Sequence, residues 1–169
     1  MSDGRGLTIA AAGHWLLAAD RIGPLVLQRL EGRYGPDVEL CDLGTGGLAL
    51  LDQLRGQDLL IVVDACRMGG EPGELRALSL VRAGELPASL GATSVHQVGP
   101  LEALSVARHL TPDQLPRRTL LVLVETEGLD DAGEERATEL VVARVDQEVA
   151  RWRAGLGETA RSSTGPNRE

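Results

Sequence analysis

Aromatic side chains are almost missing from this sequence. Its 169 residues include no Phe, two Trp and one Tyr, which is 2% aromatic content. The core must therefore be built from Leu, Ala, Val and Ile. The scarcity also argues against a protein that binds bases or sugars by stacking them on aromatic rings.

Cysteines and long apolar runs are scarce as well. Cys41 and Cys66 are the only cysteines and form no CxxC pair, so neither a disulfide framework nor a cysteine-rich zinc site is expected. No apolar run approaches the ~20 residues that a membrane-spanning helix needs. The first residues, "MSDGRGLTIAAAG", lack the basic start and long apolar region of a signal peptide. We expect a cytoplasmic protein.

Clustered positive charge is missing too. Seventeen Lys and Arg residues stand against 25 Asp and Glu, which gives a net charge of -8, and the basic residues are scattered along the chain. Nucleic acids and anionic membranes are bound through concentrated basic surfaces. We therefore expect neither as a partner.

Short apolar runs alternate with amphipathic segments along the chain. Runs that end at Gly or at a polar residue predict strands, and apolar residues at three- and four-residue spacing predict helices. The predicted strands cover residues 7–13, 37–44, 58–65 and 119–128, with a short edge strand at 75–80. The predicted helices cover residues 21–34, 48–54, 100–110 and 141–152.

This alternation is typical of a three-layer α/β/α sandwich with a mostly parallel, twisted sheet of about five strands. The domain is expected to span residues 1–153. Residues 154–169 have no apolar anchor beyond Leu156, so we expect them to form a disordered tail. We also expect the Thr45 hydroxyl to cap the helix at 48–54.

Several polar residues follow the predicted strands. Ligands of α/β sheets bind at the carboxyl ends of the strands, and that edge receives Asp20, Asp42, Thr45, Asp64 and His96. Among these, Asp20, Asp64 and His96 combine two carboxylates with one imidazole. Such donors suit Ni²⁺, Zn²⁺ or Mn²⁺ and leave coordination positions open.

Each of the three residues also has a purely structural interpretation. Asp20 precedes a helix and is equally well explained as its N-cap. A lone histidine such as His96 is more often a surface residue than a ligand. For Asp64 the structural interpretation is weaker, because a carboxylate after "LLIVV" is costly to bury unless another group pairs with it.

Other catalytic motifs are not found. "GTGG" is not a GxGxxG fingerprint, and "MGGEPGE" lacks the Lys-Ser/Thr of a P-loop. No GxSxG elbow occurs. Neither cysteine has a histidine at a recognisable spacing, which leaves little support for thiol catalysis.

Four segments in order resemble the nickel-iron hydrogenase maturation proteases. They are "GHWLLAADRIG", "DLGTGGLALLDQL", "DLLIVVDACRMGGEPGEL" and "SVHQVGPLEAL". They are similar to that family's G-N-x-L-x-x-D-[DE]-x-[IVF]-G, D-x-G-T-x-G, L-I-[IV]-[VA]-D-A and Ser-x-His segments, with similar gaps. The likeness extends over roughly residues 7–153.

The resemblance implies an endopeptidase that removes the C-terminal extension of a nickel-iron hydrogenase large-subunit precursor after nickel insertion. It places the family's metal-recognising residues on Asp20, Asp64 and His96. It further implies that the nickel comes with the precursor and gates the cleavage, although zinc or another divalent cation could occupy the same site.

The sequence departs from the family at three positions. His14 replaces an Asn, Ala19 stands where an acidic residue usually precedes the ligand carboxylate, and Thr126 replaces the Pro of a Glu-Pro ending. His14 either adds a nitrogen donor or hydrogen-bonds its own loop, and we favour the second. The departures affect partner specificity more than the fold or the reaction.

Two other functions stay open. One is a maturation chaperone that binds the nickel-loaded precursor without cleaving it, because His14 and Ala19 have cost it activity. The other is a small-molecule or nucleotide-binding α/β module.

Overall fold

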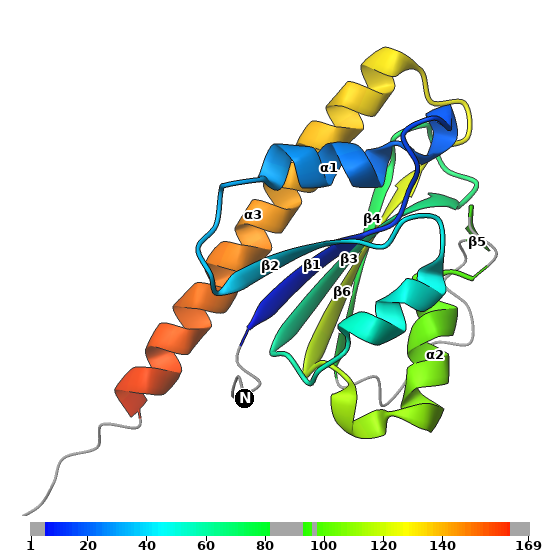
Figure 1. The fold of residues 1–169 in the computed structure, drawn as a ribbon. Coiled ribbons are helices and arrows are strands. Elements are labelled where there is room, and N and C mark those ends of the chain that lie inside the picture. Colours follow the sequence, from blue (N-terminus) through cyan, green and yellow to red (C-terminus); the bar gives the residue numbers. More distant parts are fainter. Residues whose placement is uncertain (1–5, 82–92, 96–97, 163–169) are drawn as a thin grey trace, which may run out of the picture.

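The computed structural model describes residues 6–81, 93–95 and 98–162, with only the backbone for Ala19 and for residues 157–162. Within these limits the chain forms one sheet with helices on both faces (Figure 1). His96 lies outside the described residues, as does the segment from 82 to 92.

The sheet has the strand order β2-β1-β3-β6-β4. Its parallel strands are β1 (Leu7–Ala11), β2 (Val38–Asp42), β3 (Leu59–Arg67) and β6 (Arg118–Glu125). Two strands run antiparallel to their neighbours: β4 (Leu75–Val81) at the edge beside β6, and β5 (Thr93–Ser94) beside the end of β3. The predicted mostly parallel sheet is confirmed, and β5 is an addition to it.

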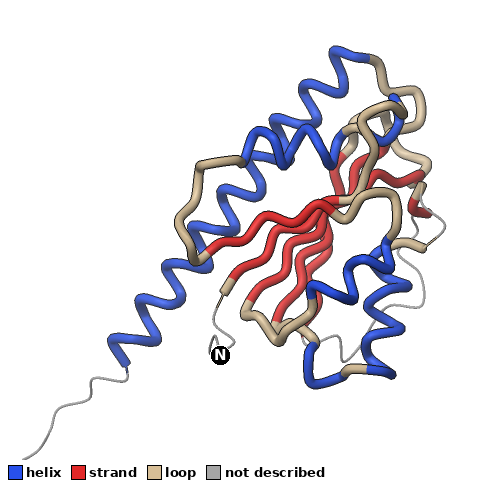
Figure 2. Tube along the Cα trace, viewed as in Figure 1, coloured by secondary structure: helices blue, strands red, loops and turns tan. Residues whose placement is uncertain are grey.

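Helices form the outer two layers. On one face lie α1 (Ile22–Leu30) and α3 (Asp131–Ser162); on the other lie α2 (Pro100–Leu110) and the 3-10 helix η2 (Gly47–Gln53) (Figures 1 and 2). Two shorter 3-10 helices, η1 (Ala18–Asp20) and η3 (Pro112–Gln114), lie at opposite ends of the strands. The α/β/α sandwich is therefore confirmed.

Side chains of the buried strands alternate between the two faces, as the strand geometry requires. Ile61 and Val63 of β3 belong to the core beneath α1 and α3, whereas Leu60 and Val62 belong to the core beneath α2 and η2. Both cores are aliphatic, as the composition predicts. Trp152 and Tyr34 pack only at the margin of the α1/α3 core.

Three details differ from the sequence predictions. Residues 47–53 form a 3-10 helix instead of an α-helix, and its N-cap is Gly46 with no side-chain cap bond, so the predicted cap by Thr45 is wrong. The final helix continues to Ser162, past the expected boundary at 153. The disorder expected for the rest of the tail concerns residues 163–169, which lie outside the described residues.

No helix in the described part of the chain is long and apolar enough to cross a membrane.

Candidate functional site

A tightly packed turn carries the chain from β1 into α1. A Cβ atom on Gly13 would collide with the carbonyl oxygen of Asp20 and lie 2.6 Å from Cδ of Pro24. A Cβ atom on Gly23 would collide with the carbonyl oxygen of Ala12. The two glycines of "GHWLLAADRIG" thus let backbone segments touch, and this contact fixes where Asp20 lies.

Asp20 is the last residue of η1 and is 5% exposed. Its backbone N–H donates to the carbonyl of Leu17 (2.8 Å), and its carbonyl accepts from the N–H of His14 (2.9 Å). The N-cap of α1 is Arg21, which makes no side-chain cap bond. The interpretation of Asp20 as the helix cap is therefore wrong.

Arg21 connects this turn to the start of α3. Its Nε lies 3.2 Å from Oε2 of Glu134, and its Nη2 lies 3.1 Å from Oε1 of the same carboxylate. A longer contact of 3.4 Å joins it to Asp131. A two-point guanidinium–carboxylate contact fixes orientation as well as distance. Arg21, the residue after Asp20, is therefore attached both to α1, which it precedes, and to α3.

Asp64 lies within β3 and is completely buried. The register explains its position: β1 pairs with β3 only as far as Val63, whereas β6 pairs with β3 up to Cys66. Asp64 is thus the first residue of β3 beyond the end of β1. The Ala12 N–H donates to the carbonyl of Val63 (3.1 Å), which joins the start of the Asp20 turn to the residue before Asp64.

Cys66 lies beside this carboxylate. Its Sγ donates to Oδ2 of Asp64 at 3.7 Å. Burial raises the pKa of the Cys66 thiol strongly, and the negative charge and hydrogen bond of Asp64 raise it further. Cys66 is therefore a protonated thiol at neutral pH, which agrees with the lack of sequence support for thiol catalysis.

The segment that leads to His96 is attached to the same end of β3. Ser94 pairs with Cys66, and the Val95 N–H donates to the carbonyl of Ala65 (3.2 Å). The chain is described again from Val98, and a Cβ atom on Gly47 would collide with the Val98 carbonyl oxygen. The described residues on both sides of His96 thus pack at the carboxyl edge, while His96 itself is not described.

The loop after β2 lies at the same edge and is bonded to the turn that follows β1. Oδ1 of Asp42 accepts from the Gly44 N–H (2.8 Å), and the Gly13 N–H donates to the Gly44 carbonyl (2.9 Å). This turn accounts for Gly44, which has a positive φ, and the close contact with Val98 accounts for Gly47.

His14 hydrogen-bonds its own loop: its Nδ1 accepts from the Leu16 N–H at 3.1 Å. This bond supports the structural interpretation of His14. Within the part of the chain that the structure describes, no three His, Cys, Asp or Glu side chains lie together as a metal site. His96 is outside that part, so the predicted triad stays a prediction.

Sequence reasoning did not select Glu125, a buried carboxylate at the end of β6. Its Oε2 accepts from the N–H groups of Met68 (2.6 Å) and Gly70 (3.2 Å), and its Oε1 from that of Glu127 (3.0 Å). Burial acts to raise the pKa of Glu125, but these donors outweigh it and the pKa is lowered. The signal was available, since "TLLVLVE" ends a buried strand with a carboxylate as "LLIVVD" does.

Fold and site together define an α/β protein with buried carboxylates at the carboxyl edge of a mostly parallel sheet. The family model described as "Hydrogenase maturation protease" matches residues 24–152. The hydrogenase 2 maturation protease of Escherichia coli is 34% identical over 128 residues, which cover 73% of this chain and 75% of that protein. The chain belongs to the hydrogenase maturation protease family.

Other similar proteins support the same family. HupD of Thiocapsa roseopersicina, named a hydrogenase expression/formation protein, is 34% identical over 131 residues, 75% of this chain. The chain spans only 57% of that relative and 61% of HoxM of Azotobacter vinelandii. The structure of the hydrogenase maturating endopeptidase HybD from E. coli superimposes with a TM-score of 0.63 at 29% identity, over 85% of this chain and 93% of HybD.

Proposed function

We propose that this protein is an endopeptidase that removes the C-terminal extension of a nickel-iron hydrogenase large-subunit precursor. It acts in the cytoplasm after nickel insertion, and Asp20, Asp64 and His96 recognise the nickel that the precursor carries. The observation that supports this most strongly is Asp64, a fully buried carboxylate at the point where β1 ends and β3 continues.

Backbone hydrogen bonds attach the chain segments that precede Asp20 and His96 to the residues on either side of Asp64. The Ala12 bond to Val63 leads toward Asp20, and the Val95 bond to Ala65 leads toward His96. Val95, which precedes His96 in the sequence, is thus bonded to the residue after Asp64. This connectivity favours a common site for the three side chains.

Such a site suits a substrate that arrives with its own metal ion. Two carboxylates and one imidazole are acceptable ligands for Ni²⁺ and fill only part of its coordination sphere. In the cleavage step a water oxygen attacks the scissile carbonyl carbon, a site carboxylate takes up the water's proton, and the proton passes to the amine that leaves. A precursor without nickel lacks the group that these side chains recognise and stays uncut.

Co-expression with the matching precursor tests the proposal, with intact mass as the readout. The wild-type protein is expected to shorten the precursor at its C-terminus only when nickel is supplied. Asp20→Asn and His96→Ala are each expected to lower the processing rate at least ~100-fold, the usual scale for loss of an acid–base group. Asp113→Asn and His109→Ala are matched controls, since Asp113 is exposed on η3 and His109 on α2 bonds only its own helix.

Each alternative gives a different result. A maturation chaperone would bind the nickel-loaded precursor and leave its mass unchanged. A nucleotide-binding module would gain thermal stability from nucleotides but none from the precursor. An unprocessed precursor in the presence of wild-type protein and sufficient nickel counts against the endopeptidase.

A further inference from the structure

A groove of about 290 Å³ lies beside the candidate site, between α1 and strand β2. Leu27 lines it from α1, Glu31 from the C-cap of that helix, Leu40 and Asp42 from β2, and Trp15 from the turn that follows β1. Trp15 is 48% exposed. The groove thus combines aliphatic and polar side chains with a large aromatic side chain that is only half covered.

Strand β2 is an edge strand of the sheet, with β1 as its one neighbour among the described strands. The Leu7 N–H donates to the Asp37 carbonyl, and the Leu43 N–H donates to the Ala11 carbonyl. The backbone N–H and C=O groups of the odd-numbered residues from 37 to 43 therefore point toward β1. Because bonding direction alternates along a strand, the N–H and C=O groups of Leu40 and Asp42 point away from β1. These groups form an edge to which another strand can add.

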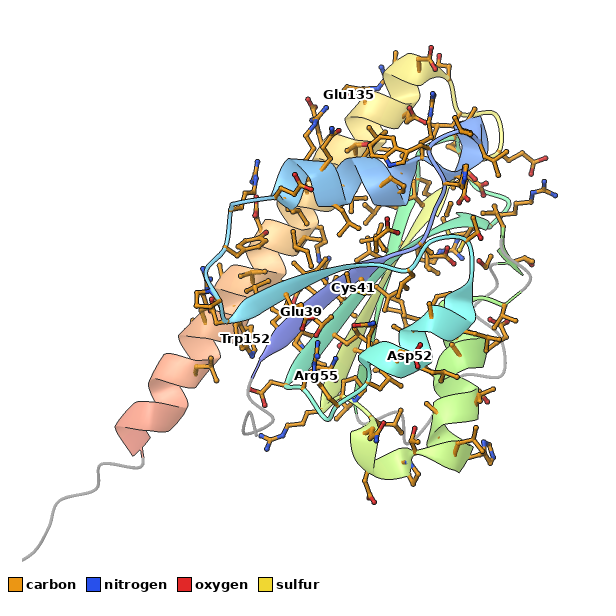
Figure 3. The ribbon with its side chains drawn as sticks, viewed as in Figure 1. Glu39, Cys41, Asp52, Arg55, Glu135 and Trp152 are labelled. Carbon is orange, nitrogen blue, oxygen red and sulfur yellow. The ribbon has the colours of Figure 1, made fainter. Side chains whose placement is uncertain are left out.

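The side chains of the same residues point to the groove. Glu39 and Cys41 lie on the opposite face of β2, where Glu39 pairs with Arg55 (Figure 3). Leu40 packs against the core beneath α1. A strand added at this edge therefore places every second side chain over the groove.

Charge also distinguishes the groove. Glu31 and Asp42 are both exposed at its margin, while the neighbouring arginines Arg29 and Arg33 are engaged with Glu135 and Asp146. The groove thus presents two carboxylates beside the aliphatic side chains of Leu27 and Leu40. It suits a segment with one aliphatic side chain and a nearby basic one.

We propose that an extended segment of the precursor, beside the bond to be cut, adds as a strand to the open edge of β2. Its aliphatic side chain enters the groove against Trp15 and Leu40, and its basic side chain pairs with Glu31 and Asp42. This proposal rests on the proposed function, since it names the peptide that the endopeptidase holds. The mode of binding is strand addition, in which backbone bonds provide affinity and side-chain pockets provide selectivity.

The path of such a segment leads to the candidate site. The C-terminal end of β2 is joined to the turn that carries Asp20 through the bond from Gly13 to Gly44. Trp15 belongs to that same turn and lines the groove. A strand lying along β2 therefore reaches the carboxyl edge where Asp64 lies.

Amide hydrogen exchange, followed for individual residues by NMR, tests the strand addition. The Leu40 and Asp42 amides are expected to exchange rapidly in the protein alone and to slow at least ~10-fold with saturating precursor. The Cys41 amide faces β1 and is expected to be slow in both conditions. Analytical ultracentrifugation measures whether the protein self-associates without precursor. If the Leu40 and Asp42 amides were protected by self-association alone, the edge would bind a second copy of the chain and the proposal would be overturned.

Kinetics test the side-chain contacts. Trp15→Ser and Glu31→Lys are expected to raise KM for the precursor about tenfold, equivalent to 1.4 kcal/mol, with kcat little changed. Glu139→Lys makes the same charge change on an exposed position of α3 and is expected to leave KM unchanged. Both groove positions are half or fully exposed, so the variants should fold.

The results separate this proposal from the proposed function. Cleavage by the wild-type protein without protection of Leu40 and Asp42, or with unaltered KM in both groove variants, overturns the docking and leaves the endopeptidase. Protection without any cleavage supports the docking and overturns the endopeptidase. Absence of both protection and cleavage overturns both.

Discussion

Two buried carboxylates occupy neighbouring strands with different surroundings. Asp64 in β3 has a thiol at 3.7 Å, whereas Glu125 in β6 accepts three backbone N–H groups from the loops that follow β3 and β6. A carboxylate surrounded by N–H donors is held in its charged form. Glu125 is therefore a structural anchor for the loop after β3.

Glu125→Gln is expected to destabilise the fold by about 1–3 kcal/mol at pH 7, because an amide replaces a charged acceptor of three buried bonds. The lowered pKa of Glu125 means that its contribution is complete above its ordinary value of 4.5 and is lost as the pH falls through the lower folded value. Urea unfolding should thus show a wild-type advantage that shrinks below about pH 4. Glu127→Gln, on an exposed side chain, is the control, and equal stability of both variants at pH 7 would refute the anchor.

Gly23→Ala is expected to destabilise the protein by about 2 kcal/mol although it lies in α1, where Ala is normally favoured. The new Cβ atom would collide with the Ala12 carbonyl, and backbone on both sides leaves little room to relax. Gly155→Ala is a matched control, because no atom lies within 4 Å of the corresponding Cβ position in α3. Thermal unfolding of both variants measures the difference. A Gly23→Ala protein as stable as Gly155→Ala would contradict the close contact.

The site residues could be predicted from sequence to different degrees. Asp20 and Asp64 stand out because a carboxylate next to an apolar run needs a reason to be there. The same pattern at Glu125 shows the limit: the sequence cannot tell a carboxylate that binds loop N–H groups from one that faces a substrate. Whether Asp20 caps α1 was also undecidable, because that depends on η1, a 3-10 turn with no sequence pattern of its own.

At the scale of elements, α1 and α3 lie side by side, and ion pairs join them beyond their shared apolar core (Figure 1). Arg21 precedes α1 and contacts Glu134, while Arg29 near its end contacts Glu135. The first pair is partly buried and the second is exposed, with side-chain exposures of 32% and 11% against 38% and 51%. Only the first lies next to the Asp20 turn.

Arg21→Ala is expected to lower precursor processing severalfold, because the residue after Asp20 loses its attachment to α3. Its cost in stability should be small, about 0.5–1.5 kcal/mol, since the arginine is about one-third exposed. Arg29→Ala, which removes an exposed ion pair, should leave both stability and processing nearly unchanged. Processing assays and thermal unfolding of both variants compare the two pairs, and equal processing would show that α3 does not position the turn.

The elements that the sequence missed share a physical cause. A strand as short as β5, with two residues, offers too few positions for a pattern. The seven residues of η2 contain the leucines of an amphipathic segment, but a helix of only about two turns cannot be assigned as α or 3-10 by spacing alone. The long buried strands β3 and β6 were predicted well because a continuous β-branched and aliphatic run has few other interpretations.

The whole molecule is a sandwich whose stability depends on aliphatic packing across two thin cores. Without aromatic residues inside, many small contacts from β3 and β6 replace the few large ones that a Phe or Trp would supply. Its longest helix, α3, covers one face and then projects beyond the sheet (Figure 1). Val141, Val145 and Val149 are buried against the sheet, and Trp152 packs at the edge of that core.

This arrangement defines where the folded unit ends. From Arg153 to Leu156 the side chains of α3 are exposed, although Arg153 still makes a two-point contact with Asp37. A chain that ends at Ala154 is expected to keep its melting temperature within about 3 °C of the full-length value, because none of the side chains described beyond that point is a buried apolar group. A chain that ends at Glu148 loses Val149 and Trp152 and should melt at least about 6 °C lower, at 2–4 °C per kcal/mol. Calorimetry of the two truncations decides the matter: if the Ala154 chain were as unstable as the Glu148 chain, the projecting turns would belong to the folded domain, and the boundary predicted at residue 153 would be wrong.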